Sequence, residues 1–347
     1  KVAGDFEEIN VCGDPATYRV FNGYSGEGTL TTLKIDSDVL SLMAAAYKSG
    51  EMPTITIITS QTMPGTNRTE RVAYSDITID DLIRGMVGHD LKEQFPKRDC
   101  PIGEVGFRVE GISREGILNN ISFEARKGEV VGICGLVGAG RTETARAIFG
   151  IDPKDAGRVF IDGKEAVIRK PLDAINAGIG FVTEDRKTEG LILCRDCKEN
   201  ISIAALRDFV RSGKLNLRRE QKSCQDYVEK MHIKTPSLRQ KVVNLSGGNQ
   251  QKIVLAKWLM SDAKVLFLDE PTRGIDIGAK VEVYNIINEI AAAGKCVIVI
   301  SSEMTELMGI CDRIVVMCRG AITGEERKGQ FTQESLMYLA TGGSAAV

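Results

Sequence analysis

The sequence has no long apolar run and little net charge. Nowhere does it approach the ~18 consecutive apolar residues that a membrane-spanning helix needs, and no secretory pattern stands at its start. The net charge of its 347 residues is −2, so no global basic field argues for a nucleic-acid partner. The length suits two domains, or one large domain with an extension. Because the first residue is Lys1 rather than Met, the sequence is compatible with a fragment.

The sequence also lacks a regular cysteine framework, although it contains nine cysteines. Cys194 and Cys197 have redox or zinc spacing, yet no second pair completes a metal site. The cysteines in or beside strand-like runs are predicted to be small buried hydrophobes; they are Cys134, Cys296, Cys311 and Cys318. We therefore expect reduced thiols in a cytosolic protein.

What the sequence does contain is a glycine-rich stretch between a predicted strand and a predicted helix. Residues 135–142 read Gly-Leu-Val-Gly-Ala-Gly-Arg-Thr, and they follow the apolar run Val130–Cys134. In this context backbone N–H groups can surround an anion at a helix N-terminus, and the spacing fits the P-loop template. The template has Lys where this chain has Arg141. The predicted ATP-binding residues are Gly135, Gly138, Ala139, Gly140, Arg141, Thr142 and Glu143.

Two consecutive carboxylates end a later apolar run, Lys264–Leu268. The carboxyl end of a buried parallel strand is the expected place for chemistry in an α/β sheet. Asp269 is predicted to hold Mg²⁺ together with the Thr142 hydroxyl. Glu270 is predicted to orient or deprotonate an attacking water. The alternatives are a glycine-rich connection without a ligand and an Asp-Glu-Pro cap on the following segment.

Strand-like and helix-like segments alternate from Val105 onward. This pattern predicts an α/β fold, a P-loop sheet with a helical insertion at 190–262, preceded by a small β-rich segment. The predicted strands include 105–110, 121–125, 130–134, 157–162, 180–183, 264–270, 295–301 and 313–317. The predicted helices include 143–149, 224–231 and 250–260.

Residues 1–80 have a different texture and supply no catalytic cluster. Strands are predicted at 28–35 and 54–59, with a short helix at 37–48 between them. The segment resembles the tail tube proteins of contractile phages, without that family's C-terminal portion. The resemblance is carried by residues 20–29, 43–50 and 70–74. The chain would then be a fusion; the alternative is an N-terminal extension.

Residues 81–103 are predicted to be a linker between this segment and a cassette at 104–343. Residues 79–87 suit a short amphipathic helix, which Gly88 can end. The charged stretch Lys92–Pro101 contains two prolines and suits an exposed connection. His89, within the linker, is expected to be solvated.

The stretch Leu245–Lys252 reads Leu-Ser-Gly-Gly-Asn-Gln-Gln-Lys. Ser246 is predicted to cap a helix that starts near Asn249, with glycine N–H groups left free for an anion. Here the sequence resembles the ATP-binding cassette ATPases, whose signature this motif is. The resemblance extends from about Ile79 to Gly343. It closely resembles the C-terminal cassettes of ribose, xylose or galactose importers in three motifs, Gly140-Arg-Thr-Glu143, Glu184-Asp-Arg-Lys187 and Asp269-Glu-Pro-Thr-Arg-Gly-Ile-Asp276.

The resemblance implies roles for further residues. Glu184 stands at the Q-loop position, Ser302 at the position of the switch histidine, and Asp276 in the D-loop. The signature residues would contact a partner's ATP; they are Leu245, Ser246, Gly247, Gly248, Asn249 and Gln250. Because Arg141, Glu184 and Ser302 depart from the catalytic pattern, and no aromatic occupies the adenine loop at 113–116, ATP binding is better supported than rapid hydrolysis.

The implied partners are ATP with Mg²⁺, a second cassette of the N-terminal type, membrane permease subunits and, indirectly, a periplasmic sugar-binding protein. No nucleic acid is expected. The implied location is the cytoplasmic side of the bacterial inner membrane. Two other functions stay open: a soluble cassette ATPase not tied to transport, and a non-functional fusion with a phage structural fragment.

Overall fold

The computed structural model of the chain describes residues 100–343, Phe95 and Pro96, and the backbone of four strands nearer the N-terminus. The chain divides into two units, Lys1–Gln94 and Phe95–Val347. This division falls inside the predicted linker range.

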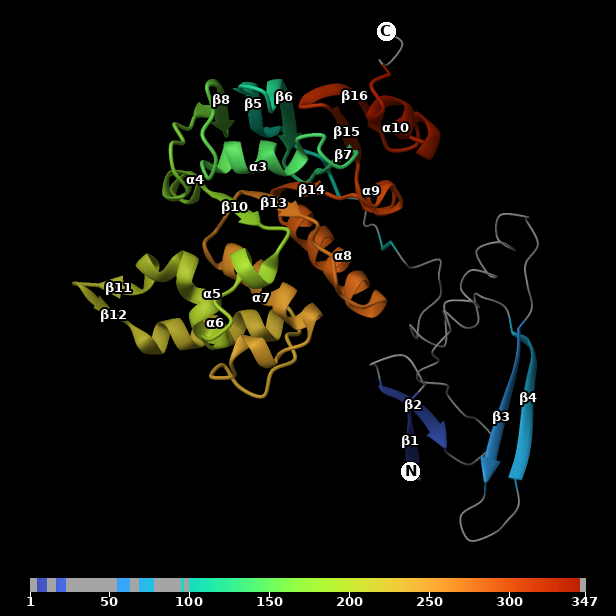
Figure 1. Cartoon of the computed structure of the whole chain (residues 1–347). Coiled ribbons are helices and arrows are strands. Elements are labelled where there is room, and N and C mark those ends of the chain that lie inside the picture. The colour runs from blue at the N-terminus through green and yellow to red at the C-terminus, as the bar shows by residue number, and fades with distance from the viewer. Residues whose placement is uncertain are drawn as a thin grey trace. The chain divides into compact units, whose positions relative to one another are not determined.

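In the first unit, two antiparallel hairpins are described (Figure 1). Strand β1 (Asp5–Asn10) pairs with β2 (Thr17–Asn22), and β3 (Ile55–Thr62) pairs with β4 (Thr69–Ile77). Strand β3 confirms the strand predicted at 54–59. The strand predicted at 28–35 and the helices predicted at 37–48 and 79–87 lie outside the described residues.

A six-stranded sheet forms the centre of the second unit. Its order is β10, β13, β14, β7, β15, β16, with the first five strands parallel and β16 antiparallel to β15. Every residue of β7, β13 and β14 is buried, as continuous apolar runs in a parallel sheet require. The bounds are Ile179–Val182, Val265–Asp269, Cys296–Ile300, Val130–Gly135, Arg313–Cys318 and Ala321–Arg327, in sheet order.

A second, antiparallel sheet packs on the other side of helix α3 (Arg141–Phe149). Its order is β6 (Leu118–Arg126), β5 (Val105–Arg114), β8 (Ala156–Ile161), β9 (Lys164–Glu165). Helix α3 contacts β5 and β6 of this sheet and β7 and β10 of the central sheet. Phe107 and Phe267 join the two sheets edge to face, with ring centroids 5.6 Å apart. The strands predicted at 105–110, 121–125 and 157–162 are confirmed.

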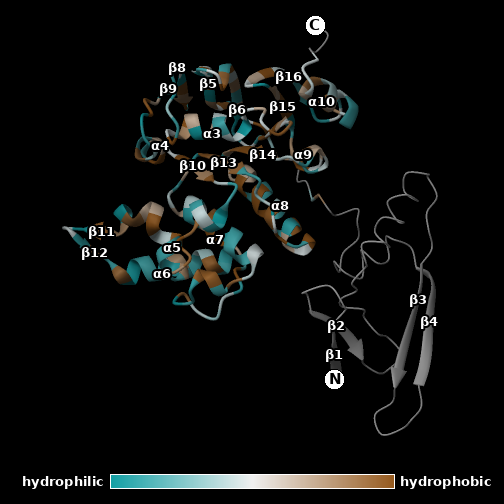
Figure 2. Cartoon of the chain, viewed as in Figure 1, coloured by the Kyte–Doolittle hydropathy of each residue, from teal (hydrophilic) through white to brown (hydrophobic). Residues whose placement is uncertain are grey.

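The remaining helices cover the central sheet and form a helical lobe (Figure 1). The lobe contains α5 (Cys197–Ser202), α6 (Leu217–Lys230), α7 (Gly247–Met260) and the hairpin β11–β12 (Val210–Arg211 and Lys214–Leu215). The others are α4 (Pro171–Ala177), α8 (Ile277–Ala292), α9 (Met304–Ile310) and α10 (Gln333–Ala340). The helices predicted at 224–231 and 250–260 are confirmed, and both start earlier than predicted. Hydrophobic residues concentrate on the central strands β13 and β14 (Figure 2).

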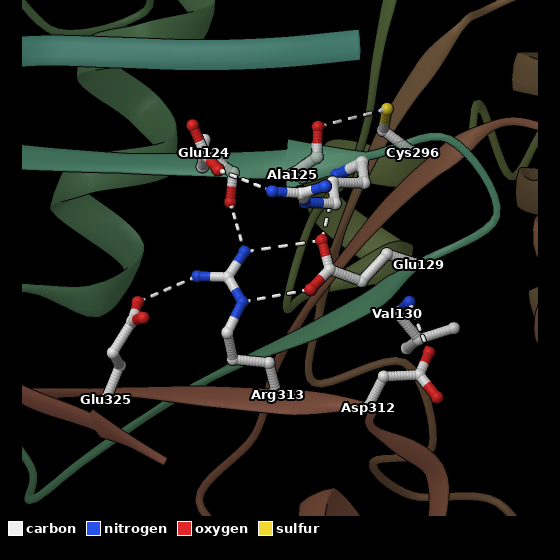
Figure 3. Close-up of polar contacts among 9 residues, drawn as sticks. Glu124, Ala125, Glu129, Val130, Cys296, Asp312, Arg313 and Glu325 are labelled. Carbon is white, nitrogen blue, oxygen red and sulfur yellow. Dashed lines mark hydrogen bonds and ion pairs between the residues drawn. The ribbon is translucent and has the colours of Figure 1, made fainter. Parts of the chain in front are cut away.

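A buried arginine ties both sheets together far from the glycine-rich loop. Arg313, at the start of β15, pairs with Glu129 through two nitrogens, at 2.9 and 3.3 Å. It also pairs with Glu325 on β16 at 2.8 Å and donates to the Glu124 carbonyl on β6 at 2.6 Å (Figure 3). Each buried charge of this cluster therefore has a partner, and removing one of them would leave an uncompensated charge at the junction of the sheets.

Candidate functional site

The glycine-rich loop connects β7 directly to α3, as the sequence predicts. Gly138 and Gly140 have φ values of +79° and +95°, and Gly140 is the N-cap of α3. Gly135 ends β7, where a Cβ would lie 2.6 Å from the Met317 carbonyl oxygen. The loop therefore needs glycine both for its backbone angles and for its close approach to β15. Its shape leaves N–H groups at the start of α3 for an anion.

Asp269 ends β13 beneath this loop and is fully buried. Neither of its carboxylate oxygens has a hydrogen-bond partner. Burial raises the pKa of the Asp269 carboxyl to about 7, and the negative charge of Glu270 adds to this shift. Thr142 and Asp269 line the same cavity of about 310 Å³. A buried carboxylate without a partner is an energetic liability unless a cation completes it.

Glu270 and Arg141 face each other across the mouth of the loop. Arg141 Nη1 lies 4.0 Å from Glu270 Oε1, and both side chains are nearly buried, at 12% and 13% exposure. The same nitrogen donates to the Ser301 carbonyl at 2.6 Å. The backbone N–H of Ser302 donates to Glu270 Oε1 at 2.7 Å. The end of β14 therefore holds both the arginine and the carboxylate.

A cavity of about 660 Å³ gathers most of the residues predicted for the chain's own nucleotide site. Glu184 reaches it from the end of β10, and it forms an ion pair with Arg273 from the segment after β13. The full lining is Val137, Gly138, Ala139, Gly140, Arg141, Thr142, Glu143, Glu184, Glu270, Arg273, Ser302 and Glu303. The structure thus brings together four segments that the sequence separates by up to 166 positions (303 minus 137).

The signature segment lies at the start of α7, outside that cavity. Ser246 is the N-cap of α7, but its hydroxyl makes no capping bond to the helix backbone. The predicted position of Ser246 as N-cap is therefore confirmed, but its capping bond is absent, and α7 begins at Gly247, two residues before the predicted start near Asn249. The Asn249 amide explains the difference, since its Nδ2 donates to the Ser246 hydroxyl at 2.8 Å. Gln250 is buried and donates to the Val242 carbonyl.

Asp276 caps helix α8, and its Oδ1 accepts a hydrogen bond from the Ala279 N–H at 2.9 Å. Its present contact is therefore a structural one. Leu245, which precedes the signature serine, is half-buried and packs against the hydrophobic core.

Sequence reasoning missed three polar residues around the site. Arg273 lines the main cavity, and only its place in the quoted motif pointed to it. Glu306 is buried and accepts from Thr272 at 2.7 Å and from Ser301 at 2.5 Å, so it joins the segments after β13 and β14. Arg186 bonds the backbone after β13. Arg186 stands in the quoted motif Glu184–Lys187, but its backbone partners lie 87 and 88 positions away. Glu306 has one partner five positions away and one 34 positions away, and no motif marks it.

The cysteines are largely buried, as predicted, with Cys134, Cys296 and Cys311 in the core and Cys318 half-buried. Cys194 is exposed, whereas Cys197 is buried and its thiol donates to the Gln240 carbonyl. Within residues 95–96 and 100–343, no helix is long and apolar enough to cross a bilayer.

Two family models match the chain. A model described as ABC transporter matches residues 118–273, and a model described as phage tail tube protein matches residues 1–95. The fold and the family match together place the described core in the class of ATP-binding cassettes, and residues 118–273 match the ABC transporter family. Both resemblances predicted from the sequence are confirmed, and the phage match extends beyond the predicted 75–80 residues.

The relatives of this cassette include proteins named for sugar import. A Rhizobium etli protein whose name assigns it to ribose, galactose or methyl galactoside import is 52% identical over 76% of this chain and 50% of its own length. The ribose import ATP-binding protein of Bacillus licheniformis is 46% identical over 79% of this chain and 55% of its own. The chain spans about half the length of the curated relatives it matches.

Solved structures show the same fold. An ATP-binding cassette of an ABC transporter in its ADP conformation aligns with a TM-score of 0.56 at 22% identity, over 69% of this chain and 96% of that one. The cassette cbiO1 of Clostridium perfringens aligns with a TM-score of 0.57 at 22% identity, over 67% and 93%. The predicted α/β P-loop fold with a helical subdomain is therefore confirmed.

Proposed function

We propose that residues 104–343 are the C-terminal type of cassette of a bacterial monosaccharide importer, which couples ATP binding and hydrolysis to sugar uptake. The observation that carries this proposal is the shared cavity, where the glycine-rich loop, Glu184, Glu270 and Ser302 converge. The names of its relatives support monosaccharides as the class of cargo. The fold supports nucleotide binding.

The residues around Asp269 fit a magnesium ion. Both oxygens of its buried carboxylate lack a partner, and the Thr142 hydroxyl lines the same cavity. Carboxylate and hydroxyl oxygens are ligands that Mg²⁺ accepts together with phosphate oxygens and water. Thr142 and Asp269 would hold the ion, Asp269 through its water shell. Once bound, Mg²⁺ neutralises charge on the nucleotide phosphates and so favours cleavage.

The chain's own groups then divide the work of the site. The N–H groups at the start of α3 bind phosphate oxygens. Glu270 orients the attacking water and accepts its proton, which requires that Ser302 leave one carboxylate oxygen available. Arg141 contributes positive charge, but its Ser301 contact holds it at the end of β14. Own-site hydrolysis is therefore expected to be slow.

The signature segment serves a second nucleotide in this proposal. Leu245–Gln250 lies outside the chain's own cavity, and the N–H groups of Leu245 and Gln250 are bonded to the Val242 and Ser246 carbonyls. The N–H groups of the first helical turn, Gly247–Asn249, would contact ATP held by another cassette. The implied partner is a cassette of the N-terminal type, in a complex with membrane permease subunits at the cytoplasmic face of the membrane. A periplasmic sugar-binding protein would deliver the sugar.

Calorimetry of MgATP binding tests the core of this proposal. Thr142→Ala combined with Asp269→Asn should abolish Mg²⁺-dependent binding, because both proposed magnesium-binding groups are lost. The matched control is Asp226→Asn, which alters an exposed carboxylate on α6 and should leave binding unchanged. Unchanged affinity in the double variant would contradict the assignment.

A further inference from the structure

Arg186 hydrogen-bonds to the backbone of the segment between β13 and α8. It is the first residue of a π-helical turn, Arg186–Gly190, an element that is rare in proteins. Its Nη1 donates to the Arg273 carbonyl at 2.6 Å, and its Nη2 donates to the Gly274 carbonyl at 3.0 Å. Two adjacent carbonyls are thus held by one planar fork.

The same guanidinium lies against the first residue of the signature helix. A Cβ on Gly247 would lie 2.8 Å from Nη2 of Arg186 and 3.1 Å from the Gly274 carbonyl oxygen. On the next residue, Gly248, a Cβ would lie 2.6 Å from the Ala279 Cβ in the first turn of α8. The start of α7 is therefore packed directly on the segment 273–279, and Arg186 sits at that contact.

The segment held by Arg186 also reaches the nucleotide cavity. Arg273 lines that cavity and pairs there with Glu184, two residues before Arg186. The Glu184–Arg273 pair is 40% and 64% exposed, so solvent screens it and it is weak alone. The bonds from Arg186 are to backbone carbonyls, so they fix the position of the chain itself.

We propose that Arg186 is a positioning residue that sets the start of the signature helix relative to residues 273–276, and thereby couples this chain's own cavity to the signature offered to a partner's nucleotide. The inference rests on the proposed function because it assigns one nucleotide to the chain's own cavity and another to the signature segment. Its structural half, the fixing of 246–250 by Arg186, stands on the contacts alone.

Arg186→Lys is the informative variant. It keeps the positive charge and most of the length, but an ammonium cannot bond two adjacent carbonyls in the plane of a fork. Lys187→Gln is the control, because it removes a charge from the neighbouring exposed side chain.

Amide hydrogen exchange of the full chain without nucleotide tests whether Arg186 fixes residues 246–250. In Arg186→Lys the amides of residues 246–250 and 273–276 should exchange roughly tenfold faster, the factor that one lost charged hydrogen bond corresponds to. Amides of β7 should keep their wild-type rates. Wild-type exchange at 246–250, or equal acceleration in β7, would overturn the inference.

The proposed coupling is tested by measuring ATP turnover in a complex with an N-terminal type of cassette from a related importer. Turnover should fall about tenfold in Arg186→Lys while the chain's own MgATP affinity stays within about threefold of wild type. A general loss of structure would lower both together and overturn the role. If the wild-type chain binds no MgATP, the proposed function fails, while the nucleotide-free exchange still decides the role of Arg186.

Discussion

Arg141 donates a hydrogen bond of 2.6 Å to the backbone carbonyl of Ser301, 160 residues away. The residue that the P-loop template reserves for phosphate is therefore bonded to the protein itself. Because Ser302 simultaneously donates to Glu270, the end of β14 engages the two charged groups expected to act on ATP. This arrangement explains in structural terms why the chain's own site is expected to be slow.

Replacing Arg141 by lysine should strengthen MgATP binding. The Arg141 guanidinium is held by the Ser301 carbonyl. A lysine side chain is flexible and ends in a compact ammonium, so we expect that ammonium to bind the nucleotide phosphates instead. We expect about tenfold tighter binding in Arg141→Lys, since one hydrogen bond to a charged group is worth about 1.5 kcal/mol. Isothermal calorimetry measures the change. Arg195→Lys, a matched change on the exposed lobe, should have no effect. Weaker binding in Arg141→Lys would show that the fork itself contacts phosphate.

The buried Asp269 should make the nucleotide-free chain less stable as pH rises. Burial raises its pKa to about 7, so the folded state keeps a proton that the unfolded chain releases above about pH 4. Stability from this group is complete below that pH and is lost as pH rises through 7. Asp269→Asn should therefore gain on wild type by about 3 kcal/mol between pH 5 and pH 8, because the loss spans about two pH units and each is worth about 1.4 kcal/mol. Urea unfolding with a chelator present measures this, and a pH-independent difference would refute it.

The signature should matter more than the chain's own carboxylate in a two-cassette complex. On the proposed function, Ser246→Arg would block the segment that meets the partner's ATP, whereas Glu270→Gln would alter a site that we expect to be slow already. Losing one preorganised donor typically lowers the rate by about 10²–10³, so we expect the larger loss from Ser246→Arg. Steady-state ATPase assays of the complex compare the two. A larger loss from Glu270→Gln would identify this chain's own site as the working one.

Residues 1–75 should be dispensable for nucleotide binding. Every residue lining the main cavity falls between Val137 and Glu303. A chain lacking 1–75 should bind MgATP within about twofold of the full chain. A longer truncation that also removes Phe95 should lower the melting temperature, because Phe95 stacks on Tyr284 with centroids 5.5 Å apart. A large loss of affinity in the first truncation would make the N-terminal unit part of the cassette.

The local parts of the site could be read directly from the sequence. A fully apolar run followed by glycines and a hydroxyl residue specifies a strand, a turn and a helix start within twenty positions, and β7 and α3 follow that pattern. The apolar run before Asp269 likewise predicts a buried strand with a carboxylate at its end. Strand burial and turn geometry of this kind depend on residues that are neighbours in the sequence, so the local pattern of apolar residues and glycines predicts them.

Only the tertiary structure decided what the site's side chains bond to. The Ser246 hydroxyl accepts a hydrogen bond from the Asn249 side chain instead of the expected capping bond from the helix backbone. Glu306 joins Thr272 to Ser301, and Arg186 joins the backbone at Arg273 to the start of the signature helix. Most of these contacts join segments that are distant in the sequence. The segments meet at one edge of the sheet only when all the parallel strands have paired. The sequence therefore determined which groups are present, and the fold determined which of them are already engaged.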